Sequence, residues 1–171
     1  YYIGKYERAL MEVEESINIW KDVEEPYPNK IWAYNNKGLI LRKLGQYEKA
    51  IEFHEQTLLK FQESAFFDKG GLASIYSGLG ADYSAFGDYE KAIYFYLKAV
   101  EKILLKGGTV RSFSEADTNN LLAAAHRQLE EYETAKEYEI KALNIWAASN
   151  HAEIYRAQNG LGQIAFAKKD Y

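Results

Sequence analysis

The sequence contains no cysteine, which excludes disulfide bonds, thiol nucleophiles and thiolate metal sites together. The same absence fits a reducing compartment, and we expect a cytoplasmic protein. Only two prolines occur among the 171 residues, Pro26 and Pro28, where they are expected to end one helix and space the next. No window approaches the roughly 20 apolar residues that a membrane-spanning helix needs. We therefore expect no membrane partner.

A concentrated positive charge is also missing. The formal net charge is -4, and Lys and Arg are interspersed among Asp and Glu, so no basic stripe is available to follow a phosphate backbone. Nucleic acid is therefore not expected as a partner. Hydrophobic residues make up 47% and charged residues 27%, as in ordinary globular domains. The first residue is Tyr1 and no signal segment precedes it, which predicts a fragment of a longer protein.

The chain instead contains a repeated phrase, GQYEKA from Gly45 and GDYEKA from Gly87. Small residues keep fixed offsets around each copy. Because antiparallel helices approach closely only where side chains are small, the spacing predicts one tight helix pair per repeat. The aligned tyrosines are Tyr6, Tyr47, Tyr89, Tyr132 and Tyr171, at spacings of 41, 42, 43 and 39 residues. The small positions after the tyrosines are Ala9, Ala50, Ala92 and Ala135, followed by Ser16, Thr57, Ala99 and Ala142. The small positions ahead of the repeated phrase are Gly38, Gly80, Ala123 and Gly162.

One copy resembles the tetratricopeptide repeat: Tyr76-x-x-Leu79-Gly80-x-x-Tyr83, followed by Ala92, Tyr96 and Ala99, with Tyr replacing the usual Trp. The preceding copy departs from this pattern, with Lys37 where Leu is usual and His54 at the second aromatic position. The period of about 42 residues exceeds the standard 34. It is similar to the longer repeats of kinesin light chains and GoLoco-type spindle-orientation adaptors, and bacterial signalling proteins use similar repeats.

The resemblance implies an all-α fold, a right-handed α-solenoid of antiparallel helix pairs, the tetratricopeptide superhelix. We expect helices near residues 5–20, 29–43, 47–63, 69–85, 89–106, 112–129, 132–148 and 151–168. A single solenoid fragment, 1–171, is predicted to comprise a partial repeat 1–28, repeats 29–68, 69–111 and 112–150, and a partial repeat 151–171. A solenoid normally ends in a polar capping helix, which this chain lacks.

Nothing in the sequence predicts catalysis, a metal site or a cofactor. His54, His126 and His151 are the only histidines, and no two share the i, i+4 spacing of a helical metal site. We expect His126 at an inter-helix packing position, and His54 and His151 at the surface or in packing. Carboxylate runs are typical of solvated helix faces. The segment Gly78-Leu79-Gly80 lies mid-helix without a preceding strand, so it is no phosphate loop.

The resemblance implies that the first helix of each pair lines a concave groove. Transferring the groove positions repeat by repeat gives Trp32, Asn35, Leu39 and Arg42; Ser74, Ser77, Ala81 and Ser84; Asp117, Asn120, Ala124 and Arg127; and Arg156, Asn159, Gln163 and Phe166. We predict partner binding by Trp32, Asn35, Arg42, Ser77, Asn120, Arg127, Arg156, Asn159 and Gln163. The asparagines would bind the amides of an extended peptide, and the arginines would bind carboxylates or phosphates in a mildly positive groove.

Several alternatives stay open at this point. The concave face could be idle, with Asn and Arg serving only to solvate it. The repeats could instead be the regulatory or sensory arm of a larger signalling enzyme or protease, or could self-associate through their terminal helices. The clamp that some family members use for chaperone tails requires Lys three residues before the small position, where this chain has Asn35, Ser77, Asn120 and Asn159. Chaperone C-terminal tails are therefore not expected ligands.

Overall fold

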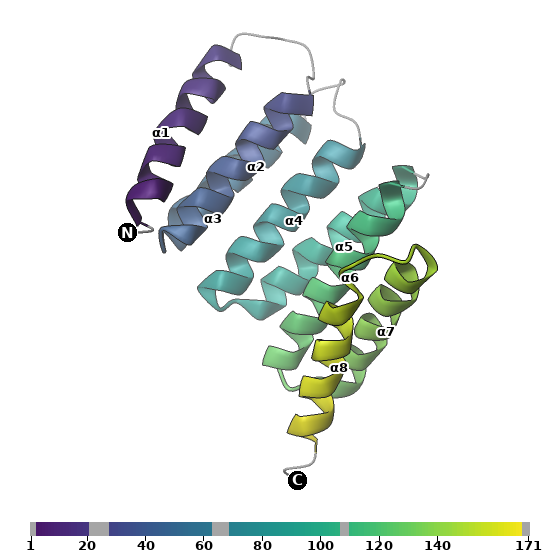
Figure 1. The fold of residues 1–171 in the computed structure, drawn as a ribbon. Coiled ribbons are helices and arrows are strands. Elements are labelled where there is room, and N and C mark those ends of the chain that lie inside the picture. The colour runs from purple at the N-terminus through teal and green to yellow at the C-terminus, as the bar shows by residue number, and fades with distance from the viewer. Residues whose placement is uncertain (1–2, 21–27, 63–68, 107–109, 169–171) are drawn as a thin grey trace.

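The computed structural model describes residues 3–20, 28–62, 69–106 and 110–168. Within these residues the chain forms helices only, and successive helices run antiparallel from one end of the molecule to the other (Figure 1). The helices are α1 (Ile3–Trp20), α2 (Pro28–Lys43), α3 (Tyr47–Gln62), α4 (Lys69–Phe86), α5 (Tyr89–Lys106), α6 (Val110–Gln128), α7 (Tyr132–Ala148) and α8 (Ile154–Ala167). The predicted helices are confirmed, and α8 starts later than expected because a turn occupies the residues before Ile154.

Helices α2, α4, α6 and α7 end in the same way. In each case a residue one or two positions after the helix adopts a positive φ: Gly45 at 74°, Gly87 at 99°, Glu130 at 59° and Asn150 at 49°. The next N–H then bonds back across the last turn, the geometry of a Schellman cap. These bonds are Gln46 N to Leu41 O (2.9 Å), Asp88 N to Tyr83 O (3.0 Å), Glu131 N to His126 O (2.9 Å) and His151 N to Trp146 O (2.9 Å). A shared cap gives the helix pairs a similar connection.

The small residues of the repeat lie where helices cross. Ala50, Ala92 and Ala135 are fully buried. A Cβ on Gly38 would lie 1.9 Å from Cε1 of His54, and one on Gly80 would lie 2.5 Å from the ring of Tyr96. Each glycine therefore makes room for one large side chain from the second helix of its own pair, as the sequence pattern predicts.

Aromatic side chains fill the seams between helices. Tyr83 stacks on Phe95 with ring centres 5.4 Å apart, and Tyr34 meets Phe61 edge-on at 5.2 Å. Trp146 is completely buried in a cluster with alanines from α6, α7 and α8. Tyr34, Tyr76, Tyr83 and Tyr96 are buried, whereas the aligned tyrosines Tyr6, Tyr47, Tyr89 and Tyr132 are half-buried. Such ring pairs stabilise a core beyond the area that they bury.

The helices form an inner and an outer layer. In the inner layer α2 contacts α4, α4 contacts α6, and α6 contacts α8. In the described residues the outer helices α1, α3, α5 and α7 make no comparable contacts with one another. A stack whose first helices touch while its second helices spread apart curves toward the first helices. The contacts thus place α2, α4, α6 and α8 together on the side where the sequence predicts the groove.

Candidate partner-binding surface

The side chains predicted for the groove share the inner side of α2, α4, α6 and α8, and we call this set the inner face. It comprises Trp32, Asn35, Leu39, Arg42, Ser74, Ser77, Ala81, Ser84, Asp117, Asn120, Ala124, Arg127, Arg156, Asn159, Gln163 and Phe166. All of them are at least partly exposed. The largest apolar members, Trp32 and Phe166, are 67% and 71% exposed and belong to α2 and α8. The inner face therefore spans four helices and carries an exposed aromatic residue on the first and on the last.

Arg42 is held by a carboxylate that sequence reasoning missed. Its Nη1 contacts Oδ1 of Asp82, a completely buried residue on α4. The second carboxylate oxygen of Asp82 lies 2.5 Å from Nδ1 of His54 on α3. His54 is 1% exposed, so its predicted place in packing is confirmed and a surface position is not. The three side chains join α2, α3 and α4.

Arg127 has a similar buried partner, Glu139 of α7, which is also completely buried. Arg127 Nη1 donates to Glu139 Oε1 at 2.6 Å, and Asn120 Nδ2 donates to Oε2 at 2.8 Å. Burial raises the pKa of Glu139 above its ordinary value, although the bonds from Asn120 and Arg127 act in the opposite direction. Glu139 occupies the repeat position of His54 and Tyr96, and that register is the signal that could have found it.

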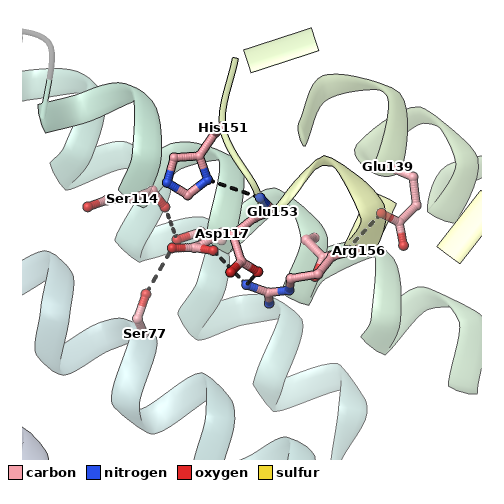
Figure 2. A network of polar contacts seen from close by, with 9 residues as sticks. Ser77, Ser114, Asp117, Glu139, His151, Glu153 and Arg156 are labelled. Atoms are coloured by element: carbon pink, nitrogen blue, oxygen red, sulfur yellow. Dashed lines mark hydrogen bonds and ion pairs between the residues drawn. The ribbon is translucent and has the colours of Figure 1, made fainter. Parts of the chain in front are cut away.

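Arg156 at the start of α8 is paired with a carboxylate of the inner face itself. Its Nη1 lies 2.8 Å from Oδ1 of Asp117 and 3.3 Å from Oε2 of Glu153 (Figure 2). The guanidinium carbon lies 5.4 Å from the ring centre of Trp146, within the range of a cation–π contact. Both members of the Arg156–Asp117 pair remain substantially exposed. This pair links α6 to α8.

The predicted asparagines occupy equivalent positions in different environments. Asn120 donates to Glu139, whereas Asn159 is exposed. Asn35 Oδ1 and His54 Nε2 are both buried, and neither has a hydrogen-bond partner among the described residues. A Cβ on Gly78 of α4 would lie 2.9 Å from that Nε2 and 3.4 Å from that Oδ1. Two polar atoms without partners therefore flank one glycine of α4.

Ser77, the predicted site residue of α4, takes part in a short hydroxyl chain. Its Oγ lies 3.5 Å from Oγ1 of Thr118, which donates to the backbone carbonyl of Ser114 at 2.7 Å (Figure 2). Thr118 is buried and Ser77 is half-buried. The hydroxyl of Ser77 therefore lies where α4 meets α6, at the edge of the inner face.

The other two histidines, His126 and His151, make hydrogen bonds within the fold. His126 is buried, its Nδ1 lies 2.5 Å from Oε2 of Glu131, and its ring stacks on Tyr138 at 5.4 Å, which confirms the predicted packing role. Nδ1 of His151 accepts from the backbone N–H of Glu153 at 3.2 Å (Figure 2). No group of three potential metal ligands occurs in the described residues. None of the described helices combines the length and the apolar character needed to cross a bilayer.

Lys37, the departure from the repeat pattern, belongs to the opposite side of α2. Its Nζ lies 2.8 Å from Oε1 of Glu14 on α1 and 4.8 Å from the ring centre of Phe53 on α3. It forms part of a cleft of about 330 Å³ between the outer helices α1 and α3, lined by Leu10, Glu14, Lys37, Leu41, Gln46, Lys49, Glu52, Phe53 and Gln56. A long cation is accommodated here because the outer helices spread apart.

Antiparallel helix pairs, touching inner helices and an exposed inner face together define an α-solenoid of helix-pair repeats. Residues 1–59 match the family model described as tetratricopeptide repeat. This match and the structural neighbours support the assignment to the tetratricopeptide repeat family that the sequence pattern predicts. No curated protein matches the chain.

Solved structures extend the same fold over nearly the whole chain. BtubC (BKLC) from P. vanneervenii is 24% identical with a TM-score of 0.75, and the match covers 98% of this chain and 66% of that one. RapI is 16% identical with a TM-score of 0.78, covering 97% and 59%. The kinesin light chain TPR-like repeats of Podosopora anserina are 19% identical with a TM-score of 0.73, covering 98% and 80%. The chain thus spans less than two thirds of the first two proteins, and these identities show the fold alone.

Proposed function

We propose that the chain is a non-catalytic scaffold that binds a protein or an extended peptide segment on its inner face. The observation that carries the proposal is the at least partial exposure of every predicted inner-face side chain, although the small repeat residues Gly38, Gly80 and Ala123 beside them are buried. The residues proposed to contact the partner are Trp32, Asn35, Arg42, Ser77, Asn120, Arg127, Arg156, Asn159 and Gln163. Exposed aromatic side chains such as Trp32 are typical anchors of interfaces.

The inner face is also held rigidly, which favours binding. Arg42 and Arg127 are fixed by carboxylates that lie beneath them on other helices. Rigid side chains lose less conformational entropy when a partner binds than mobile ones do. A preformed surface of this kind suits an extended segment that becomes ordered along it. The comparison with RapI and with kinesin light chain repeats adds only that the same fold occurs in those proteins.

The proposal can be tested with peptides of about 12 residues selected from a random display library on the full chain. We expect the triple variant Trp32→Ala/Asn159→Ala/Gln163→Ala to weaken their binding by at least about tenfold, measured by fluorescence anisotropy. These positions are suitable because all three side chains are exposed. Asn120 and Arg127 are less suitable, because their removal would leave Glu139 buried without partners.

A matched control changes exposed residues of the outer layer. Tyr94 and Leu97 of α5 are 55% and 45% exposed, so Tyr94→Ala/Leu97→Ala removes a similar amount of surface. We expect this control to retain binding and both variants to retain the helical circular dichroism of the parent chain. Equal loss of binding in the two variants, or unchanged binding in the triple variant, would contradict a role for the inner face.

A further inference from the structure

We propose that the segment bound on the inner face is uncharged: an extended peptide that offers its backbone amides, neutral polar side chains and bulky apolar side chains, rather than an acidic or phosphorylated one. This inference rests on the proposed function and specifies the class of partner. It departs from the mildly positive groove expected from the sequence.

The charges of the inner face are already compensated within the chain. Its charged members are Arg42, Asp117, Arg127 and Arg156, and every one of them contacts an oppositely charged side chain. Three guanidinium groups meet three carboxylates, those of Asp82, Asp117 and Glu139, and Glu153 adds a further contact to Arg156. The arginines therefore add no net positive charge to attract an anionic partner.

Displacing these pairs would be unfavourable. Asp82 and Glu139 are completely buried, so a carboxylate or phosphate that took over Arg42 or Arg127 would leave a buried anion without its cation. A buried charge that has lost its partner strongly destabilises the folded state. An uncharged ligand incurs no such penalty.

Two polar atoms that lack a partner among the described residues lie beneath the inner face and not on it. Asn35 Oδ1 and His54 Nε2 are both inaccessible to solvent, and His54 is 1% exposed. A ligand on the inner face therefore does not reach them, and the class of ligand is set by the exposed side chains.

The remaining inner-face surface is apolar or amide-bearing. Trp32 is 67% and Phe166 is 71% exposed, and Asn159 and Gln163 are exposed beside Phe166 on α8. Aromatic surface binds apolar side chains, and the amides bind peptide groups of any sequence. These contacts fit a segment that combines Ser, Thr, Asn or Gln with aromatic or aliphatic residues.

The first test uses the library-selected peptides and the unmodified chain. We expect selected sequences without an excess of Asp or Glu, and dissociation constants that change by less than about twofold between about 50 and 500 mM NaCl. Enrichment of acidic residues, or affinity that falls by about tenfold over this range, would overturn the inference. This test requires no substitution and so does not depend on the folding of a variant.

The second test alters the charge balance deliberately. Glu139→Gln removes the anion beneath Arg127 with little change in volume, so we expect a library selected on this variant to become enriched in Asp and Glu and its binding to become salt-sensitive. The matched control is Glu137→Gln, two residues away on α7 and exposed, which should select the same peptides as the parent. An unchanged selection on a folded Glu139→Gln chain would contradict the role of the buried acid.

The outcomes separate the inference from the proposed function. If acidic peptides are selected and lose binding in Trp32→Ala/Asn159→Ala/Gln163→Ala, the inner face is the site and only the uncharged class is wrong. If no peptide is selected, or if binding is indifferent to this triple variant, the proposed function itself fails, and the inference fails with it.

Discussion

At the residue scale, Gly38 leaves the least room for a Cβ among the glycines at the small positions of the repeat. The position where its Cβ would lie is 1.9 Å from Cε1 of His54. The imidazole cannot easily move away, because it is fully buried and bound to Asp82. Gly162 of α8 occupies the same place in its repeat, yet a Cβ there would meet nothing within 4 Å. The two glycines share a register and differ in their surroundings.

We therefore expect Gly38→Ala and Gly162→Ala to change the free energy of unfolding in opposite directions. Gly38→Ala overpacks a closed contact and should destabilise the chain by about 1–3 kcal/mol. Gly162→Ala removes a flexible residue from a helix without a clash and should stabilise it by roughly 0.5–1 kcal/mol. Urea unfolding followed by circular dichroism measures both. Similar changes in the two variants would contradict the close approach of His54 to Gly38.

The sequence predicts these small positions because their spacing repeats, but it does not predict the polar residues packed against them. Ala50 and Ala92 stand out by recurrence in every copy. Asp82 and Glu139 each occur once, at positions where the other copies have different residues. The repeat register marks the position of Glu139, which it shares with His54 and Tyr96, but it does not predict a carboxylate there. The burial of Asp82 and Glu139 depends on which arginine lies opposite, which is a tertiary property. The candidate residues were thus predicted by position, while the partners of the arginines were not.

At the scale of elements, ion pairs connect successive inner helices, and the pairs differ in how deeply their carboxylates are buried. Arg42 and Asp82 join α2 to α4 with the carboxylate completely buried. Arg156 and Asp117 join α8 to α6, with side chains 32% and 49% exposed. Water screens the second pair but not the carboxylate of the first. The two links therefore differ in strength although they connect helices in the same way.

Replacing Asp82 or Asp117 by asparagine should show how much each ion pair contributes to the free energy of unfolding. Asp82→Asn removes one partner of a buried pair and also the acceptor of His54, so we expect a loss of at least about 3 kcal/mol in the free energy of unfolding. Asp117→Asn should cost less than about 1 kcal/mol, as is usual for exposed pairs. Chemical denaturation of both variants in one buffer provides the comparison. Comparable losses would show that burial does not set the strength of these links.

The sequence predicted the helix boundaries more accurately than it predicted the contacts of individual side chains. The phrase containing Gly45 and Gly87 marks the end of one helix and the start of the next because glycine readily adopts a positive φ. Glu130 adopts the same conformation without that signal, and Asn150 adopts it with the residue that most often replaces glycine there. The turn after Asn150 delays the start of α8 to Ile154, where continuous helical spacing predicts residue 151. The turn that follows the cap, and not the helical spacing, therefore sets the start of α8.

At the scale of the whole molecule, each helix contacts only its near neighbours. Helix α4 contacts α2, α3, α5 and α6, whereas α1 contacts only α2 in the described residues, and α8 contacts α6 and α7. The stability of a solenoid is approximately the sum of repeat terms and nearest-neighbour interface terms. Stability is therefore expected to be uneven along the chain.

Native-state hydrogen exchange should show this unevenness in the 171-residue chain. We expect the slowest exchange in α4, α5 and α6 and the fastest in α1 and α8, because the outer members of the stack can open while the rest stays folded. Gly162→Ala should slow exchange in α8 selectively. Equal protection of all the described helices would instead indicate one all-or-none unit.

The arginine pairs have a further consequence for competition among ligands. Asp82 and Glu139 are tethered beside Arg42 and Arg127, so each acts as an intramolecular competitor at an effective concentration on the order of millimolar or higher. A free anion must exceed that concentration, or bind far more tightly, before it occupies either guanidinium. The chain thereby shields its inner face from the small anions that surround it and keeps that face available to partners recognised in another way.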